Sequence, residues 1–431
     1  MPMNSHAAQE ETAQLVFLNR DRIEWPELTE KGLVKGRSQA NIAAFLAHAG
    51  VELAHNEFAY QTIIRRQGRE RVLDDASAES LWLEADRAGL ASSQAYFYAV
   101  LGDAGRRDGF HPVRQYLDSL EWDGIERLDT WLHAYLGALD PKPDLLEDAS
   151  QAEKAGQARL MHELVRQYGR KTLIGAVRRV REPGCKHDTL LVLQGKQGLG
   201  KSTAIKALCP NKNWFTDSLK IGEDKKTIIE LTTGCWLIEL AELAGMSKRE
   251  SGTIRGMLSG ERDDARQAYG KFATRRERQF LCIGTINENE FLQDPTGNRR
   301  YWTVSLNNQT DADKVKAELT RDRDQLWAEA DYFVRKKGED STLPKRLWGA
   351  AAVEQSSRRI VDPWESKLEA LFQEADYMPQ DRIYEALGML THQQNPAITR
   401  RVSGILTAMG LELCQKRLPG NRRERGYRRP A

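Results

Sequence analysis

The chain has 431 residues, of which 40% are hydrophobic, enough for two or three domains with apolar cores at roughly 150 residues each. Its 64 basic and 62 acidic side chains leave a net charge of +2. The chain is therefore not one of the strongly charged proteins whose overall charge alone indicates a partner. No apolar run approaches the ~18 residues of a membrane span, and the five cysteines form no C-x-x-C pair, so we expect a soluble cytoplasmic protein with reduced thiols.

The first part of the chain, residues 1–110, is expected to form a helical N-terminal region of unknown role. Asp74-Asp75 is interpreted as a helix N-cap, because a polymerase or primase site needs clustered carboxylates on strands. A helical, collar-like segment over 111–182 is expected to follow. The prediction for the N-terminal region depends on three amphipathic stretches, at 40–49, 78–88 and 92–101.

The segment 190–202 is the most informative of the chain, because an apolar run leads into the pattern G-x-x-x-x-G-K-S. Such glycines let backbone N–H groups curl around a triphosphate, while Lys201 reaches the β- and γ-phosphates and the Ser202 hydroxyl ligates Mg²⁺. Apolar residues at helical spacing follow, so the loop opens onto a helix N-terminus that favours an anion. A plain glycine turn would not require Lys-Ser. The predicted ATP-binding residues are Gly195, Lys196, Gln197, Gly198, Leu199, Gly200, Lys201, Ser202 and Thr203.

Strand and helix patterns alternate around this loop, which predicts an α/β P-loop core with a largely parallel sheet over 183–345. A short apolar run ends in Glu239, with Glu242 just beyond it. We assign Glu239 to Mg²⁺ and Glu242 to activation of the attacking water, although the reverse order is equally compatible with the spacing. The next apolar run is followed by Asn287, an amide placed to contact the γ-phosphate; the simpler alternative is an Asn that caps a turn.

Two basic segments lie near these strands. Arg299 and Arg300 follow a Gly-Asn turn and suit an arginine finger that acts on the nucleotide of a neighbouring subunit. The spacing does not say which arginine reaches the phosphate, and a solvated basic turn is the alternative. The second segment reads as a hairpin with Gly270-Lys271 at its tip. Its predicted DNA contacts, against a simple exposed hairpin, are Arg266, Tyr269 and Lys271.

The last unit, 360–431, has helical patterns at 364–374, 381–387 and 398–408, followed by a basic strand-turn-strand. This order predicts a winged-helix-like module that binds duplex DNA, with a solvated basic tail as the alternative. The predicted phosphate contacts are Arg400, Arg401, Arg417, Arg422 and Arg423.

The ordered set of motifs resembles the virulence-associated E proteins of phages, prophages and phage satellites, whose ATPase domain is similar to that of superfamily 3 helicases. The resemblance covers about 109–330. Its motifs are Trp122-Asp123-Gly124 with Arg127-Leu128, Pro183-Gly184-Cys185-Lys186, the P-loop, Glu239-Leu240-Ala241-Glu242-Leu243, Gly284-Thr285-Ile286-Asn287 and Thr296-Gly297-Asn298-Arg299-Arg300.

The resemblance implies an AAA+-like core that assembles into a ring, a hexamer, with ATP hydrolysed between subunits and single-stranded DNA in the pore. It also implies a role in the replication of a mobile element. We therefore predict a Mg²⁺- and ATP-dependent single-stranded DNA translocase or replicative helicase. The alternative is an ATP-switched DNA-binding initiator or regulator that assembles without unwinding DNA.

Overall fold

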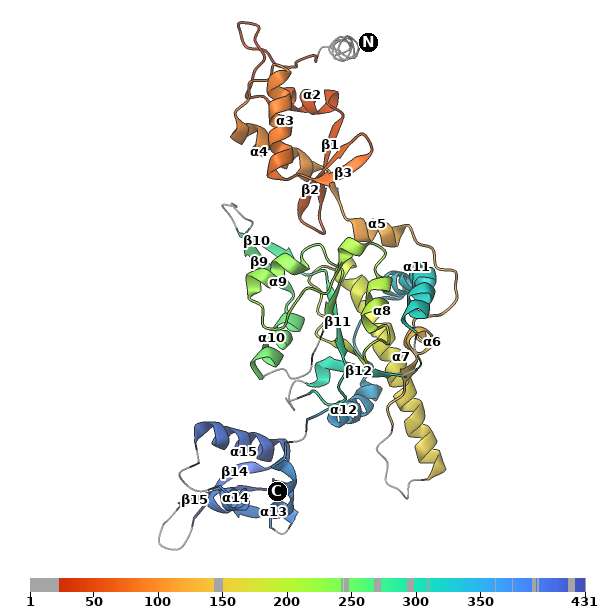
Figure 1. Ribbon diagram of the computed structural model, residues 1–431, viewed down its shortest axis with the longest axis vertical. Helices are drawn as coiled ribbons and strands as arrows, with labels where there is room; N and C mark the ends of the chain where they lie inside the picture. The colour runs from red at the N-terminus through yellow and green to blue at the C-terminus, as the bar shows by residue number, and fades with distance from the viewer. Residues whose placement is uncertain are drawn as a thin grey trace, which may run out of the picture.

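The computed structural model describes residues 23–142, 150–241, 243, 248–266, 273–292, 298–307, 309, 311–360, 362–373, 375–389, 393, 395–417 and 423–430. Three units follow one another along the chain: an N-terminal α/β unit, a central unit built on the largest sheet, and a small C-terminal unit (Figure 1). None of the described helices has the length and apolar character needed to cross a membrane.

The central sheet has six strands in the order β5-β12-β6-β11-β8-β7. All neighbouring pairs are parallel except the edge pair β5–β12, so the predicted parallel sheet is confirmed and the antiparallel edge is an addition to it. Every residue of β6, β8 and β11 is buried, which explains why these strands read as continuous apolar runs rather than as alternating ones. The strands are β5 (Ala138–Leu139), β6 (Leu190–Gln194), β7 (Phe215–Thr216), β8 (Leu237–Leu240), β11 (Leu281–Ile286) and β12 (Tyr301–Leu306).

Two tryptophans connect the elements of the central unit, one between the sheet and a helix and the other between two helices. The Trp236 indole N–H donates to the carbonyl of Ala176 on α7 at 2.9 Å, and the Trp327 indole on α11 donates to the carbonyl of Leu208 on α8 at 2.8 Å. The two rings pack with their centroids 4.2 Å apart. Both indoles are fully buried with their single donor satisfied, so each contributes a large apolar area without an unpaired polar group. The helices of the central unit are α7 (Gln151–Arg181), α8 (Lys201–Leu208), α9 (Lys225–Thr232), α10 (Lys248–Ser259), α11 (Ala312–Lys337) and α12 (Trp348–Ser357).

The N-terminal unit differs from the helical region that we predicted. Its helices are α2 (Gln39–His48), α3 (Asp75–Arg87) and α4 (Gln94–Arg107), and Asp74 caps α3 as expected. Between them lies a sheet in the order β3-β2-β1-β4, made of β1 (Val51–Asn56), β2 (Gln61–Arg66), β3 (Arg69–Val72) and β4 (Gly109–Phe110).

A turn explains this sheet. Gln67 and Gly68 both have positive φ, 51° and 72°, and they connect β2 to β3 as a two-residue hairpin loop. Ile63 and Ile64 are both buried, so the strand lacks the simple alternation by which a half-buried strand is recognised. The helical prediction was wrong here because the turn residues, and not the spacing of the apolar residues, indicate the pair of strands.

The segment between the first two units, which we predicted to be helical, contains α5 (Pro112–Asp118), α6 (Trp131–Leu136) and the start of α7, but also the short strand β5 of the central sheet. The Glu329 carboxylate on α11 accepts hydrogen bonds from the backbone N–H groups of Arg127 (2.6 Å) and Leu128 (3.0 Å). This buried contact joins the segment to the central unit, and burial raises the pKa of Glu329.

The described part of the C-terminal unit contains three α-helices and a three-stranded antiparallel sheet in the order β13-β15-β14. Its predicted helices and its last two strands are confirmed, whereas β13 is an addition. Leu368, Ile383 and Leu406, one from each helix, are buried at its centre. The elements are α13 (Glu365–Gln373), β13 (Tyr377–Pro379), α14 (Gln380–Ala386), α15 (Pro396–Ala408), β14 (Glu412–Arg417) and β15 (Arg423–Arg428).

Candidate active site

The loop between β6 and α8 adopts a conformation that only glycine accommodates easily. Gly198 and Gly200 have φ of 89° and 77°, in the left-handed region. A Cβ on Gly200 would come within 2.9 Å of the Cα of Ala312, at the start of α11. The loop and the polar ends of β8 and β11 surround a cavity of about 600 Å³. The cavity is lined by Gln197, Gly198, Leu199, Gly200, Lys201, Ser202, Thr203, Ala241, Thr285, Ile286, Asn287, Glu288 and Ala312.

The Lys201 ammonium lies at the base of the loop. It donates to the carbonyl oxygens of Gly195 (2.5 Å) and Lys196 (2.8 Å) and to Oδ1 of Asn287 (3.0 Å). Burial lowers the pKa of Lys201, while the carboxylates of Glu239 and Glu288 partly offset this effect. A buried cation held by neutral acceptors lacks a counter-charge in direct contact, so an anion in the cavity would be favoured. The structure thus brings Lys201 and Asn287 together, as the parallel register of β6 and β11 requires.

A second pair of predicted residues meets at the same cavity. The Ser202 hydroxyl donates to Oε1 of Glu239 at 2.6 Å, and Glu239 is buried at the end of β8. Thr285, near the end of β11, donates to the same oxygen at 2.8 Å. Hydroxyl and carboxylate oxygens are the ligands that Mg²⁺ prefers. Sequence reasoning missed Thr285, although its place two residues before Asn287 on a strand end could have indicated it.

Several predicted residues lie outside the described part of the structure. These are Glu242, Tyr269, Lys271 and Arg422. The strands that flank the predicted hairpin are described: β9 (Arg262–Arg266) pairs antiparallel with β10 (Ala273–Glu277). At the base of this ladder, the Arg278 guanidinium forms a buried two-pronged ion pair with Asp263, both contacts at 2.7 Å. Arg266 is the last residue of β9.

Arg299 and Arg300 lie at the amino ends of the parallel strands, which we call the amino edge of the sheet. The loop follows the carboxyl ends of the strands, at the opposite, carboxyl edge. Both arginines belong to the short helix η2 (Asn298–Arg300), which leads directly into β12, and Tyr301 pairs with Leu190 at the start of β6. The length of β6 separates the two edges by about 16 Å, since a strand rises roughly 3.3 Å per residue. Arg299 is exposed, whereas Arg300 has its Nε 3.8 Å from the Asp188 carboxylate. Both line a second cavity of about 720 Å³.

The predicted basic contacts of the C-terminal unit fall into two kinds. Arg400 is exposed, and its Nε donates to the carbonyl of Pro396 on its own helix. Arg401 instead pairs with both carboxylate oxygens of Asp362, each at 2.8 Å, and its guanidinium lies 3.7 Å from the centre of the Trp364 ring. Arg417 and Arg423 are exposed partners at the end of the β14–β15 ladder. Arg401 therefore has a structural contact that the sequence did not predict.

A family model for the virulence-associated protein E-like domain matches residues 117–360, more than half of the chain. The chain belongs to this family. The virulence-associated E-like region contains the complete central sheet, both cavities and the segment joined to Glu329.

Solved structures and curated sequences give a more distant comparison. Two structures of the NrS-1 C-terminal region in its apo form have TM-scores of 0.49 to the virulence-associated E-like chain, at 11% and 10% identity. Each comparison covers 90% of the virulence-associated E-like chain and 98% of the NrS-1 chain. A third structure of the same region has a TM-score of 0.44 at 11% identity, covering 90% and 99%. No curated protein sequence matches the chain significantly.

One motif of the virulence-associated E-like chain has a structural explanation. The Asp123 carboxylate accepts from the Arg127 guanidinium at 2.8 and 2.7 Å and from the backbone N–H of Ile125 at 2.9 Å. These bonds hold the pKa of Asp123 low, at about 2. The Trp122 ring packs against Tyr332 of α11, 4.8 Å between centroids. These contacts close the loop that runs from Trp122 to Arg127 and hold it against α11. None of these residues lines either cavity.

Proposed function

We propose that this virulence-associated E-like protein is an ATP-dependent single-stranded DNA translocase, or replicative helicase, of a phage or mobile element, with an AAA+-like P-loop core. The observation that carries the proposal is the convergence of Lys201, Asn287 and the Ser202–Glu239 pair on one cavity at the carboxyl edge of a parallel sheet. A cationic amine, an amide and an oxygen pair suited to Mg²⁺ are what a nucleoside triphosphate requires. The cavity of about 600 Å³ falls within the range of ligand sites.

In this proposal each side chain has a distinct task. Lys201 leaves its carbonyl acceptors to contact the β- and γ-phosphates, and Asn287, which already shares a hydrogen bond with Lys201, contacts the γ-phosphate and the attacking water. Ser202 and Glu239 would hold Mg²⁺, which would supply positive charge against the phosphates, and Thr285 orients the Glu239 carboxylate through its hydroxyl. Glu242 is proposed as the group that activates water, on the basis of its place just after β8.

The arginine pair supports hydrolysis between subunits. A side chain at the amino edge of the sheet cannot contact a phosphate in the cavity at the carboxyl edge of the same chain, because about 16 Å of strand lies between them. A ring in which the amino edge of one subunit faces the carboxyl edge of the next would place Arg299 or Arg300 at the neighbour's nucleotide. We propose such a ring, hexameric by analogy with the family, with an arginine finger supplied in trans.

The proposed DNA contacts come from two surfaces. The β9–β10 hairpin starts from the same amino edge, since β10 leads through Arg278 into β11, and we propose that Arg266, Tyr269 and Lys271 contact single-stranded DNA in the pore. In the C-terminal unit the order helix-strand-helix-helix-strand-strand is that of a winged helix. We propose that Arg400, Arg417, Arg422 and Arg423 contact duplex DNA there. Arg401 contributes mainly by holding α15 to Asp362.

The basic C-terminal hairpin also favours the second candidate, an ATP-switched initiator that binds duplex DNA without unwinding it. Steady-state ATP hydrolysis with and without single-stranded DNA, together with unwinding of a forked duplex, separates the two. The full chain is compared with Lys271→Ala, and with Lys336→Ala as a control at an exposed position on α11. For the helicase we expect DNA-stimulated hydrolysis and unwinding that are lost in Lys271→Ala and kept in Lys336→Ala. Hydrolysis indifferent to DNA, without unwinding, would favour the initiator.

Glu239→Gln tests the proposed magnesium site. The glutamine oxygen still accepts from Ser202 and Thr285, so the fold of the cavity is preserved, but the negative charge that would hold the cation is removed. We expect Mg²⁺-dependent ATP hydrolysis to fall on the order of 10²-fold or more, as when one preorganised electrostatic group is lost. A titration of the rate with Mg²⁺ measures this, with Glu230→Gln, on the exposed face of α9, as the control. An unchanged Mg²⁺ dependence would exclude Glu239 from the metal site.

A further inference from the structure

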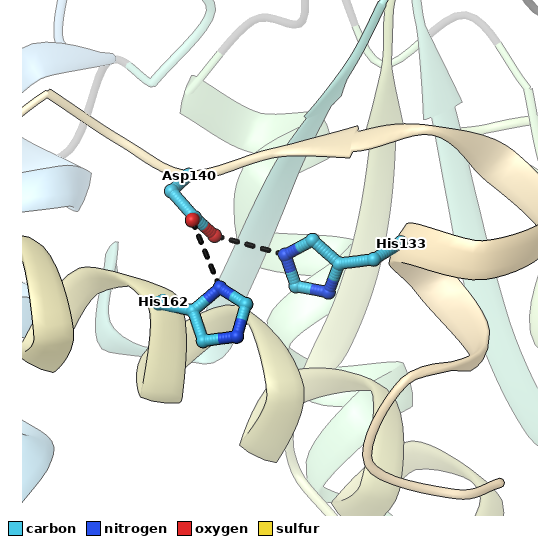
Figure 2. A group of neighbouring side chains, drawn as sticks. All are labelled: His133, Asp140 and His162. Carbon is cyan, nitrogen blue, oxygen red and sulfur yellow. Dashed lines mark hydrogen bonds and ion pairs between the residues drawn. The ribbon is translucent and has the colours of Figure 1, made fainter.

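Three side chains that the proposed ATPase does not use converge on the surface of the central unit. His133 comes from α6, Asp140 from the residue after β5, and His162 from α7 (Figure 2). The Nε2 atom of His133 lies 2.9 Å from Oδ1 of Asp140, and Nδ1 of His162 lies 2.9 Å from Oδ2 of the same carboxylate. One possible ligand atom from each residue lies within 4.8 Å of the others.

The backbone fixes these positions independently of the cluster itself. Gly137 ends α6 in the left-handed conformation, at φ 60°, and its carbonyl accepts from the N–H of Asn307, at the end of β12. The chain then pairs with β12 through β5 and presents Asp140 directly afterwards. Next to the two histidines, Leu132 and Met161 are buried in the core of the central unit. Side chains held by rigid elements are what a preorganised site needs.

The chemistry of the donors selects a class of ion. Two imidazole nitrogens and one carboxylate oxygen suit Zn²⁺ and related transition cations, whereas Mg²⁺ and Ca²⁺ prefer oxygen-only sites. Zinc bonds to such ligands are about 2.0–2.2 Å long, so small side-chain rotations would bring the three donors around one ion. The side chains of His133, Asp140 and His162 are 22%, 38% and 49% exposed, which leaves an entry path and room for water as a further ligand.

Most of the charged side chains near the cluster are paired with a partner of opposite charge. Arg166, one turn after His162 on α7, is paired with Asp129 at 2.6 Å, so its charge is locally compensated. Arg159, Glu163 and Arg166 border the same open groove as His162. Glu163 pairs with Arg346, so its negative charge is compensated as well.

We propose that His133, Asp140 and His162 form a binding site for a divalent transition cation of the Zn²⁺ type. The site is distinct from the proposed nucleotide cavity and does not depend on ATP hydrolysis. A bound ion joins α6, the β5 edge of the central sheet and α7 by direct bonds. It thereby stabilises the folded chain by an amount that rises with the logarithm of the free metal concentration above the dissociation constant.

Zinc binding by the full chain tests the proposal. After treatment with a chelator and its removal, nucleotide-free protein is titrated with ZnCl₂ by calorimetry, and thermal unfolding is followed with and without the metal. The variants are His162→Gln and Asp140→Asn, which keep the size and polarity of the surface. The control is His48→Gln, which changes an exposed histidine at the end of α2.

We expect wild type and His48→Gln to bind one equivalent of Zn²⁺ at this site and to melt at a higher temperature in its presence. His162→Gln and Asp140→Asn should each bind this equivalent at least about tenfold more weakly, since even loss of a group that only supports a ligand costs 10–100-fold. Equal zinc affinity in wild type and both site variants would overturn the proposal. So would wild-type protein that binds no zinc, which would leave the cluster as two imidazoles hydrogen-bonded to one carboxylate.

Discussion

Replacement of Lys201 by alanine is expected to reduce ATP hydrolysis by at least about 10²–10³-fold, the loss typical when one preorganised charge is removed from a transferring group. Lys201 is a buried residue, and its Nζ atom donates to Oδ1 of Asn287 at 3.0 Å and to two carbonyl oxygens of the loop, so its charge is held at the cavity. Nucleotide binding should weaken as well, since the ammonium contacts phosphate in the ground state too.

The measurement is steady-state phosphate release together with binding of a fluorescent ATP analogue. Lys206→Ala is the matched control, because Lys206 lies on the same helix with its side chain exposed to solvent. It should retain wild-type hydrolysis. A Lys201→Ala protein that folds normally and still hydrolyses ATP at the wild-type rate would contradict the assignment of the cavity.

The double variant Arg299→Ala/Arg300→Ala is expected to bind ATP with nearly unchanged affinity and to hydrolyse it about 10³–10⁵-fold more slowly, the range found for arginine fingers. The reason is positional: both residues precede β12 at the amino edge of the sheet and would contact only a neighbour's nucleotide. The two single variants then show which arginine carries the effect.

Mixing of subunits distinguishes action in trans from action in cis. In a ring that contains both Lys201→Ala chains and Arg299→Ala/Arg300→Ala chains, some interfaces combine an intact P-loop with an intact arginine pair. Hydrolysis by the mixture should therefore exceed that of either variant alone. Equal inactivity of the mixture and of both variants, in protein shown to co-assemble, would contradict a finger supplied by the neighbour.

The sequence predicted best those features that follow from local pattern. The glycine-rich turn before α8, the buried strand β6 and the place of Asn287 beside Lys201 were predictable, because parallel strands bring their carboxyl ends to one side of the sheet. The sheet of the N-terminal unit was missed since its signal is a two-residue turn at Gln67-Gly68. Residues far apart in sequence were not predictable as partners: Asp140 meets His162 only because β5 pairs with β12.

Side-chain contacts also changed the interpretation of particular motifs. Arg401 was predicted as one of several phosphate contacts, yet the structure pairs it with Asp362, and the spacing of the two residues gives no sign of this. Asp123 and Arg127, which we used only as a motif of the family resemblance, form an ion pair within a loop. In both cases the sequence identified the correct charged residues, but only the fold shows what each charge contacts.

The six-residue strand β12 connects two places that the proposed ring would set on opposite sides of each subunit. Its amino end follows Arg299 and Arg300, and its carboxyl end leads towards α11, whose first residue, Ala312, abuts Gly200 of the P-loop. A change of backbone position at Gly200 when a nucleotide enters or leaves would press on Ala312, at the start of the helix that follows β12 in the chain. In the proposed ring the chain from β12 to α11 would therefore link the nucleotide of one subunit to the arginine pair that acts on the next, which favours sequential rather than independent hydrolysis.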